Sequence, residues 1–168
     1  MTDFTALNDA DTGTDSLDSV AAPRFTQAFA DALNQRFDRV PAAQMLREVL
    51  TEVLPGQVSM VSSFGTESSV LLHLVAGADP TVPVIFIDTL RLFPETLRYR
   101  DQLVQLLGLT DVRTYEPLPE KLKEADPKFL LWSHDPDACC AVRKVEPLAR
   151  ALVGVEAWIS GRKAFQAS

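Results

Sequence analysis

The spacing of apolar positions predicts two one-sided helices near the start of the chain. Every fourth residue of the first is apolar (Phe25, Phe29, Leu33, Phe37), which is close to the period of an α-helix. The second begins near Pro41 and carries apolar residues up to Val53. Residues 1–22 are instead rich in Asp, Thr, Ser and Ala, a composition that buries little surface. We expect those residues to form a disordered tail.

Short apolar runs alternate with helical patterns after a break at Pro55-Gly56. The predicted strands lie at residues 58–61, 82–87, 112–115 and 155–159, and residues 116–134, with three prolines, are expected to form a loop. Nearly continuous apolar strands separated by helices are typical of a parallel sheet with helices on both faces. We therefore expect an α/β fold with an open, mainly parallel sheet preceded by N-terminal helices, in one domain over residues 23–168.

Composition and charge exclude several classes of function. The chain of 168 residues has a formal net charge of -7, whereas nucleic-acid-binding proteins and binders of anionic membranes usually carry a basic surface. No apolar run approaches the roughly 20 residues that cross a bilayer, and the start at Met1 lacks the features of a signal peptide. We expect a soluble protein in a reducing cytoplasm, with neither a nucleic acid nor a membrane as partner.

Cys139 and Cys140 are the only cysteines, and they are adjacent. A disulfide between neighbours departs from the preferred bridge geometry, so metal or redox chemistry is the favoured interpretation. An iron–sulfur cluster normally takes four thiolates, of which this chain supplies two. The alternative interpretation is a pair of small buried apolar residues.

Two further segments contain groups suited to an anion. Residues 62–69, Ser-Ser-Phe-Gly-Thr-Glu-Ser-Ser, lie between a predicted strand and a predicted helix and could cradle an anion, although a serine-rich helix cap is an equal alternative. No Gly-Lys-Ser/Thr is present, so the loop is not a Walker loop. Lys144 follows Cys140 by four residues on an expected helix, which places the two on neighbouring surface. The alternative is that Arg143 and Lys144 are solvated charges paired with Glu146 or Asp137.

Four blocks, in this order, resemble the adenylylsulfate (APS) and phosphoadenylylsulfate (PAPS) reductases of the adenine nucleotide alpha hydrolase-like superfamily. Ser63–Ser68 resembles their modified pyrophosphate loop, and Asp88–Thr96 resembles an Asp-Thr-Gly-x-x-x-Pro-Glu-Thr segment that helps hold the nucleotide. Cys139–Leu148 resembles the cluster-binding block of the APS-type enzymes, and Trp158–Lys163 resembles the basic segment that follows it. The resemblance covers roughly residues 40–168.

The resemblance implies a Rossmann-like fold and assigns site residues. Those expected to bind substrate are Ser62, Ser63, Phe64, Gly65, Thr66, Glu67, Ser68, Asp88, Thr89, Arg91, Gly161, Arg162 and Lys163. Cys139 and Cys140 are expected to be two of the four ligands of a 4Fe–4S cluster, with Lys144 acting electrostatically. The Cys pair favours APS over PAPS as substrate, because PAPS reductases without the cluster lack it.

The resemblance also implies a reaction in assimilatory sulfate reduction. A cysteine thiolate attacks the sulfur of the sulfonucleotide and expels AMP or its 3′-phosphate, and thioredoxin or a glutaredoxin-like reductant then releases sulfite. The family's nucleophilic cysteine and its second cluster pair, Cys-x-x-Cys, are not present in this sequence. We therefore expect an incomplete domain that is inactive alone: a fragment of a longer protein, with a degenerate or engineered truncation as the alternative.

Two departures from the family pattern bear on binding. Leu90 replaces the glycine usual after Asp-Thr, and its β-carbon disfavours a positive φ angle, while Ala164 stands where a basic residue is common. Two other functions stay open: an adenylylating enzyme of the ATP pyrophosphatase or sulfate adenylyltransferase type, and a non-catalytic nucleotide-binding remnant. The sequence does not fix the oligomeric state, and a homo-oligomer is compatible with it.

Overall fold

The computed structural model of the protein describes residues 25–161, which divide into two units between Asp38 and Arg39. The predicted tail at residues 1–22 lies outside the described residues. In the first unit, helix α1 (Gln27–Arg36) begins at Thr26, whose hydroxyl accepts a hydrogen bond from the backbone N–H of Phe29 at 3.2 Å. The rings of Phe25 and Phe29 meet edge to face at 5.7 Å. The first predicted helix is thus confirmed.

The second unit alternates strands and helices along the chain. Its elements are α2 (Ala42–Glu48), the π-helical turn η1 (Val49–Val53), β1 (Val58–Val61), α3 (Thr66–Ala78), β2 (Val84–Ile87), α4 (Pro94–Leu107), β3 (Val112–Tyr115), α5 (Pro119–Ala125), α6 (Leu131–His134), α7 (Pro136–Cys140), the π-helical turn η2 (Ala141–Val145), α8 (Glu146–Ala151) and β4 (Ala157–Ser160). Among residues 25–161, no helix has the length and apolar character needed to traverse a bilayer.

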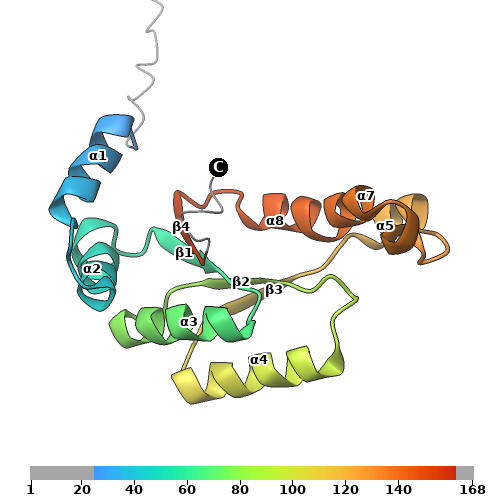
Figure 1. Ribbon diagram of the computed structural model, residues 1–168, viewed down its shortest axis with the longest axis horizontal. Helices are drawn as coiled ribbons and strands as arrows, with labels where there is room; N and C mark the ends of the chain where they lie inside the picture. The colour runs from blue at the N-terminus through green and yellow to red at the C-terminus, as the bar shows by residue number, and fades with distance from the viewer. Residues whose placement is uncertain (1–24, 162–168) are drawn as a thin grey trace, which may run out of the picture. The chain divides into compact units, whose positions relative to one another are not determined.

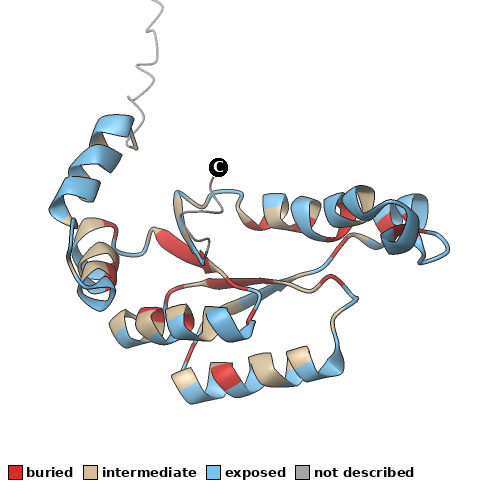
Figure 2. Cartoon of the chain, viewed as in Figure 1, coloured by how far each residue is buried: buried red, intermediate tan, exposed pale blue. Residues whose placement is uncertain are grey.

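The four strands form one parallel sheet in the order β3-β2-β1-β4. Figure 1 shows α3 and α4 on one face of this sheet and α8 on the other, with α7 and α5 farther along the same side, beyond the strands. The predicted open, parallel α/β sheet with helices on both faces is therefore confirmed. The core is densest at the centre, where Met60, Val84 and Phe86 are buried, as the red strand segments of Figure 2 show.

Several observed elements differ from the predicted ones. The fourth strand is Ala157–Ser160 and not residues 155–159. The second strand begins at Val84 and not at residue 82, because Pro83 has no N–H to donate to the sheet. The predicted loop at 116–134 contains the short helices α5 and α6, the first of which has Pro119 in its first turn. A proline there already has the φ angle that a helix requires and needs no N–H partner, so it starts a helix as readily as it interrupts one.

The connectivity creates a crevice at one edge of the sheet. The chain passes from β1 through β2 to β3 in one direction and then returns, by way of α5 to α8, to place β4 on the other side of β1. Ligands of open α/β sheets bind at such a reversal of strand order, outside the carboxyl ends of the strands. The loop after β1 and the end of β4 lie at this edge, since Val61 is in register with Ser160.

Candidate functional site

The loop that follows β1 is held in place by the buried side chain of Phe64. Its ring is fully buried and meets the ring of Phe86 edge to face, with centroids 5.6 Å apart. Phe64 has a φ angle of +53°, and its N–H donates to the hydroxyl of the buried Ser62 at 3.1 Å. Ser63, Gly65 and Thr66 are exposed. The loop therefore presents the neighbours of Phe64, and not its ring, at the carboxyl edge of the sheet.

Helix α3 begins directly after this loop without a side-chain cap. Its N-cap residue is Gly65, whose carbonyl accepts from the N–H groups of Ser68 and Ser69. The hydroxyl of Ser69 instead donates to the Thr66 carbonyl at 2.5 Å. The alternative of a serine-rich cap is thus not what the structure shows. The first N–H groups of a helix carry a partial positive charge, so this end of α3 is suited to an anion.

The loop after β2 is shaped by its own side chains. The N–H of Asp88 donates to the Tyr115 carbonyl at 3.0 Å, and the Asp88 carboxylate accepts from the N–H of Leu90 at 2.8 Å. Leu90 has a φ angle of +57°, the conformation that its β-carbon disfavours. Asp88 therefore stabilises a strained turn, in which the hydroxyl of the buried Thr89 also accepts from the N–H of Arg91 at 3.3 Å.

The cysteines end a short helix that turns into a π-helical segment. Asp135 caps α7 by accepting from the N–H of Ala138 at 2.9 Å, and Pro136 occupies the first turn. Cys139 is half-buried and packs against the apolar cluster of Leu122, Leu131 and Val142, whereas Cys140 is exposed. The interpretation of the pair as small buried residues therefore describes Cys139 only in part and does not describe Cys140. Single π-turns of the η2 kind are frequent at functional sites.

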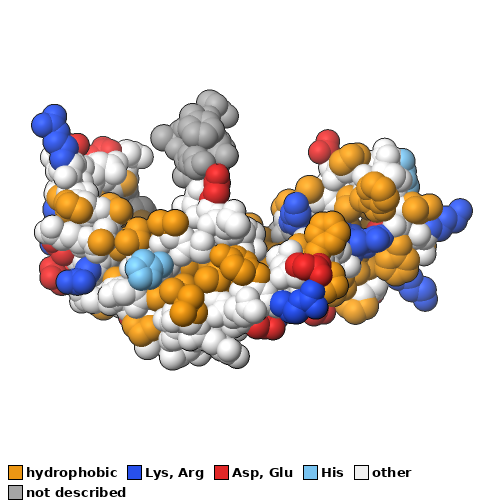
Figure 3. All heavy atoms as spheres, turned by 60° about the horizontal axis from the view of Figure 1, so that its bottom comes forward, with side chains coloured by type: hydrophobic (Ala, Val, Ile, Leu, Met, Phe, Trp, Pro, Cys, Tyr) orange, Lys and Arg blue, Asp and Glu red, His pale blue; other side chains and the backbone are white. Residues whose placement is uncertain are grey.

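The cysteine segment and the loop after β2 face one cleft of about 680 Å³. Its lining residues are Thr89, Arg91, Leu92, Phe93, Trp132, Cys139, Cys140, Arg143 and Lys144. The structure thus brings Thr89, Arg91, both cysteines and Lys144 together. Three of the lining side chains, Arg91, Arg143 and Lys144, are cationic. In Figure 3, lysine and arginine side chains lie beside hydrophobic ones at the end of the unit that contains α5 and α7.

Not every predicted site residue lines this cleft. The Ser62–Ser68 loop and Gly161 belong to the neighbouring strand ends and are not among its lining residues, and Asp88 is occupied by the turn of its own loop. Arg162 and Lys163 lie outside the described residues. The predicted residues therefore divide between the cleft and the adjoining loop at the β1 edge.

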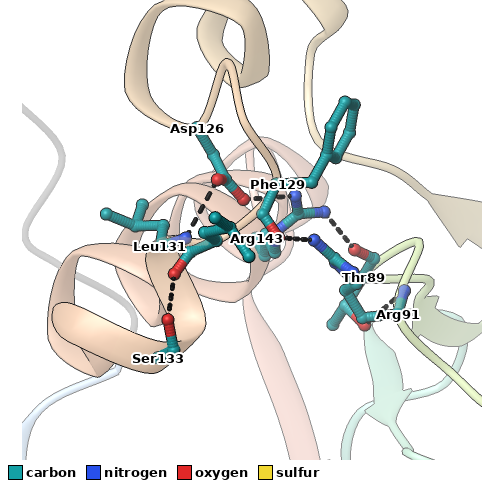
Figure 4. A network of polar contacts seen from close by, with 8 residues as sticks. Thr89, Arg91, Asp126, Phe129, Leu131, Ser133 and Arg143 are labelled. Atoms are coloured by element: carbon teal, nitrogen blue, oxygen red, sulfur yellow. Dashed lines mark hydrogen bonds and ion pairs between the residues drawn. The ribbon is translucent and has the colours of Figure 1, made fainter.

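Sequence reasoning missed a buried ion pair beside the cleft, drawn in Figure 4. The guanidinium of Arg143 donates through Nη2 to Asp126 at 2.8 Å and through Nη1 to the Thr89 carbonyl at 2.9 Å. The interpretation of Arg143 as a solvated charge paired with Glu146 or Asp137 is wrong, since the residue is only 2% exposed. Glu146 instead pairs with Arg150 at 2.9 Å. No local pattern around Asp126 indicated the pair, because its partner is 17 residues away.

The pair perturbs the Asp126 carboxyl group. Hydrogen bonding by Arg143 holds the pKa of Asp126 below its ordinary value; burial opposes this effect, and the N–H of Leu131, which donates to Asp126 at 3.0 Å, reinforces it. Arg91 crosses the same region, since its guanidinium donates to the Phe129 carbonyl and lies 5.6 Å from the Phe129 ring centroid. These contacts join the loop after β2 to residues 126–131.

The thiols fit a metal cofactor in part. Two adjacent thiols line one cleft, and the neighbouring Lys144 is suited to a negatively charged thiolate–metal group. Within the described ranges, no three His, Cys, Asp or Glu side chains are grouped as metal ligands. The donor set of this chain thus fits two of the four positions of an iron–sulfur cluster.

Comparison with known proteins identifies relatives. Residues 57–168 match the family described as Phosphoadenosine phosphosulfate reductase domain. The chain is 43% identical over 154 residues to an adenosine 5′-phosphosulfate reductase of Mesorhizobium japonicum, covering 92% of this chain and 58% of the relative. It is 49% identical over 112 residues to the enzyme of that name from Chelativorans sp., covering 67% and 46%. A phosphoadenosine 5′-phosphosulfate reductase of Thiocapsa roseopersicina is 37% identical, with 80% and 58% covered.

The fold is also similar to that of a solved structure. The crystal structure of a phosphoadenylyl-sulfate reductase from Candida auris, in a phosphate complex, superimposes with a TM-score of 0.67 at 28% sequence identity. The match covers 86% of this chain and 71% of that chain. Against the three curated relatives, the chain spans 46–58% of their lengths.

Proposed function

The chain belongs to the phosphoadenosine phosphosulfate reductase domain family, and from this membership we propose that it forms part of an oxidoreductase that releases sulfite from a sulfonucleotide. The observation that carries the proposal is the cationic cleft in which Cys139, Cys140 and Lys144 face Thr89 and Arg91. Sulfonucleotides carry phosphate and sulfonate groups, and such anions are stabilised by cationic side chains and helix N-termini.

The nucleotide is proposed to bind along the carboxyl edge of the sheet. The exposed part of the Ser62–Ser68 loop and the N-terminus of α3 would supply hydrogen-bond donors to its phosphate, and Gly161, Arg162 and Lys163, which follow β4 in the sequence, are proposed to contribute as well. Asp88 would act indirectly by keeping the loop after β2 in shape. The buried ring of Phe64 would hold the β1 loop in its conformation. Thr89 and Arg91 would then lie between nucleotide and cysteines.

The reaction is proposed to proceed by transfer of the sulfonate group to a thiolate. A new S–S bond forms between thiolate and substrate sulfur while the S–O bond to the phosphate breaks, and the nucleotide leaves with the electron pair. Lys144 and the donors at the α3 terminus would stabilise the charge that grows on the expelled phosphate. The enzyme S-sulfocysteine is then reduced by a dithiol of the thioredoxin kind, which becomes a disulfide and releases sulfite.

Cys139 and Cys140 are assigned to a 4Fe–4S cluster, and so the nucleophile would be a third cysteine, which these 168 residues do not contain. When bound, the cluster would supply a charged, polarizable group beside the substrate. Lys144 lies in the same cleft and would interact electrostatically with both. This chain alone is expected to show no turnover.

The preferred substrate is proposed to be APS. The Cys pair supports this choice, as do the names of the two relatives at 43% and 49% identity. The relative at 37% identity carries the PAPS name, so PAPS is the competitor in the test. The proposed setting is assimilatory sulfate reduction in the cytoplasm. Homo-oligomers of the whole protein are compatible with this proposal.

Calorimetric titration of the chain with APS, PAPS and Mg²⁺-ATP tests the proposal. We expect APS to bind more tightly than the other two, and Ser63→Ala to weaken that binding. Thr51→Ala removes the hydroxyl of another exposed residue, on η1, and should leave the affinity unchanged. Failure of all three to bind would contradict the proposal. Cleavage of ATP with Mg²⁺ would instead assign the chain to the adenylylating enzymes, and APS binding with no iron uptake by the whole protein would mark a nucleotide-binding remnant.

A further inference from the structure

Arg143 connects three segments that are distant in sequence. It lies on η2, three residues after Cys140, and donates both to Asp126 and to the carbonyl of Thr89 in the loop after β2 (Figure 4). Both side chains of the ion pair are nearly inaccessible, with Arg143 2% and Asp126 3% exposed. A displacement of this guanidinium therefore moves contacts on the cysteine segment and on the loop together.

The second carboxylate oxygen of Asp126 links the ion pair to the apolar cluster that packs against Cys139. It accepts from the N–H of Leu131 at 3.0 Å, and Leu131 belongs to the apolar cluster against which Cys139 packs. Asp126 thus holds two residues in place: Leu131, in the cluster that packs against Cys139, and Arg143, which follows Cys140 by three residues. A well-packed apolar side chain often stabilises a core as well as a buried ion pair does, so stability alone does not account for these directional bonds.

One donor of the Arg143 guanidinium stays unpaired among the described residues. This donor, the Nε–H, is buried, while the side chain forms part of the cleft wall. The orientation of Arg143 therefore links the cleft to the Thr89 carbonyl.

We propose that Asp126 is a positioning residue that, through Arg143, couples the nucleotide loop after β2 to the cysteine pair. A ligand that orders the loop also orders Thr89, and with it Arg143 and the turn that carries the cysteines. Such coupling is reciprocal, so occupancy at the cysteines strengthens nucleotide binding by the same factor. The inference rests on the proposed function for the identity of the nucleotide, and its geometric part rests on the ion pair alone.

The test compares alkylation of the cysteines in the full chain with and without AMP. Iodoacetamide reacts at one fixed pH, and mass spectrometry follows Cys139 and Cys140 separately. In the unmodified chain, saturating AMP should slow alkylation by about fivefold or more, the lower range of ordinary coupling. In Asp126→Asn the protection should vanish although AMP still binds, and Asp126→Glu should restore part of it. Asp111→Asn breaks an exposed Asp–Arg pair of 2.6 Å and should keep full protection.

Hydrogen exchange supplies a readout that needs no nucleotide. In Asp126→Asn, peptides covering residues 88–93 and 136–145 should both exchange faster, whereas Asp111→Asn should change neither. If the Asp126→Asn variant does not melt cooperatively, the Arg143→Lys variant is used in its place. The lysine ammonium keeps the positive charge, but it does not donate to Asp126 and to the Thr89 carbonyl in the way the guanidinium does. The same two readouts then apply.

The outcomes separate this inference from the proposed function. Equal AMP protection in Asp126→Asn and the unmodified chain would overturn the coupling, and so would AMP binding without any protection. Failure of AMP to bind the unmodified chain would count against the proposed function, and the exchange data would then decide the positioning role. Faster exchange in both segments would support that role, and faster exchange in only one would refute it.

Discussion

At the scale of single residues, Leu90 combines an exposed apolar side chain with a backbone conformation that favours glycine. The φ angle of Leu90 is +57°, and the residue is 48% exposed. For an L-residue, this conformation costs about 1–2 kcal/mol. The Asp88 carboxylate compensates in part by accepting from the Leu90 N–H. The position is therefore held in place by its neighbours and not by its own preference.

Leu90→Gly should accordingly be more stable than Leu90→Ala. Both substitutions remove the side chain, but only glycine relieves the strain, and the greater freedom of glycine in the unfolded chain offsets part of this gain. We expect the free energy of unfolding of the Gly variant to exceed that of the Ala variant by about 0.5–1 kcal/mol in urea titrations. Equal stabilities would show that the turn is not strained at this residue.

Acid should weaken the fold through Asp126. Its pKa is lowered in the folded protein, so the ionised carboxylate contributes stability that is complete above the unfolded value of about 4. That contribution is lost as the pH falls through the lower, folded value. Urea midpoints measured from pH 6 downward should therefore fall more steeply below about pH 4 in the unmodified chain than in Asp126→Asn. Parallel curves for the two proteins would contradict this assignment.

The residues of the candidate site were predictable to different degrees. The cysteines and Lys144 follow from a local motif, and the structure places them in one cleft. The strain at Leu90 was also expected, because one residue type was replaced at one position of a recognisable pattern. Asp126 gave no such signal, since its importance arises from a contact 17 residues along the chain. Long-range polar pairs of this kind depend on how elements pack, which local spacing does not encode.

At the scale of elements, helix α3 presents its N-terminus at the carboxyl edge of the sheet. Its cap residue, Gly65, has a φ angle of -70°, which any residue adopts, and a β-carbon there would meet only the Ser63 hydroxyl oxygen at 3.5 Å. The backbone conformation alone therefore does not demand glycine. The absence of a side chain matters instead for the close approach of a ligand to the helix end.

Gly65→Ala should fold normally and bind nucleotide poorly. We expect its free energy of unfolding to stay within about 0.5 kcal/mol of the unmodified value, since the added methyl makes an ordinary contact. Affinity for APS should fall by on the order of tenfold, as measured by calorimetry. Gly77→Ala in the same helix, where a β-carbon meets nothing within 4 Å, should leave the affinity unchanged. Unaltered affinity in Gly65→Ala would place the anion elsewhere.

The strands were easier to predict than the short helical segments outside the sheet. Buried parallel strands such as Val84–Ile87 form continuous apolar runs, which are visible in the sequence. The π-helical turns at Val49–Val53 and Ala141–Val145 have no comparable pattern, because one extra residue per turn leaves an amphipathic sequence nearly unchanged. Helix α6 has only four residues, too few to display a helical period.

At the scale of the whole molecule, a negatively charged chain carries a cationic cleft. The net charge is -7, yet Arg91, Arg143 and Lys144 line the space around the cysteines. Attraction of an anion into the cleft must therefore come from these lining side chains, because the net negative charge of the rest of the protein repels it. Charges at such short range are screened less by salt than a field spread over the surface.

Salt should reduce the affinity for APS through these cations. Between about 0.05 and 0.5 M salt we expect a loss on the order of threefold or more in calorimetric titrations. Lys144→Gln should bind more weakly at low salt and lose less affinity as salt is added. Lys123→Gln removes a lysine that does not line the cleft and should follow the unmodified chain. A salt dependence that is the same in both variants would exclude a role for Lys144 in attracting the ligand.

The pairing of β1 with β4 has a consequence for how the protein is made. Val58 and Ala157 are partners although about 100 residues separate them, so the interval is about 5–20 s at ordinary rates of protein synthesis. During that time, β1 can pair with β2, but the backbone N–H and C=O groups on its other edge have no β4 to pair with. An unpaired apolar edge invites pairing with other chains. Aggregation during translation should therefore compete with folding until β4 has emerged from the ribosome.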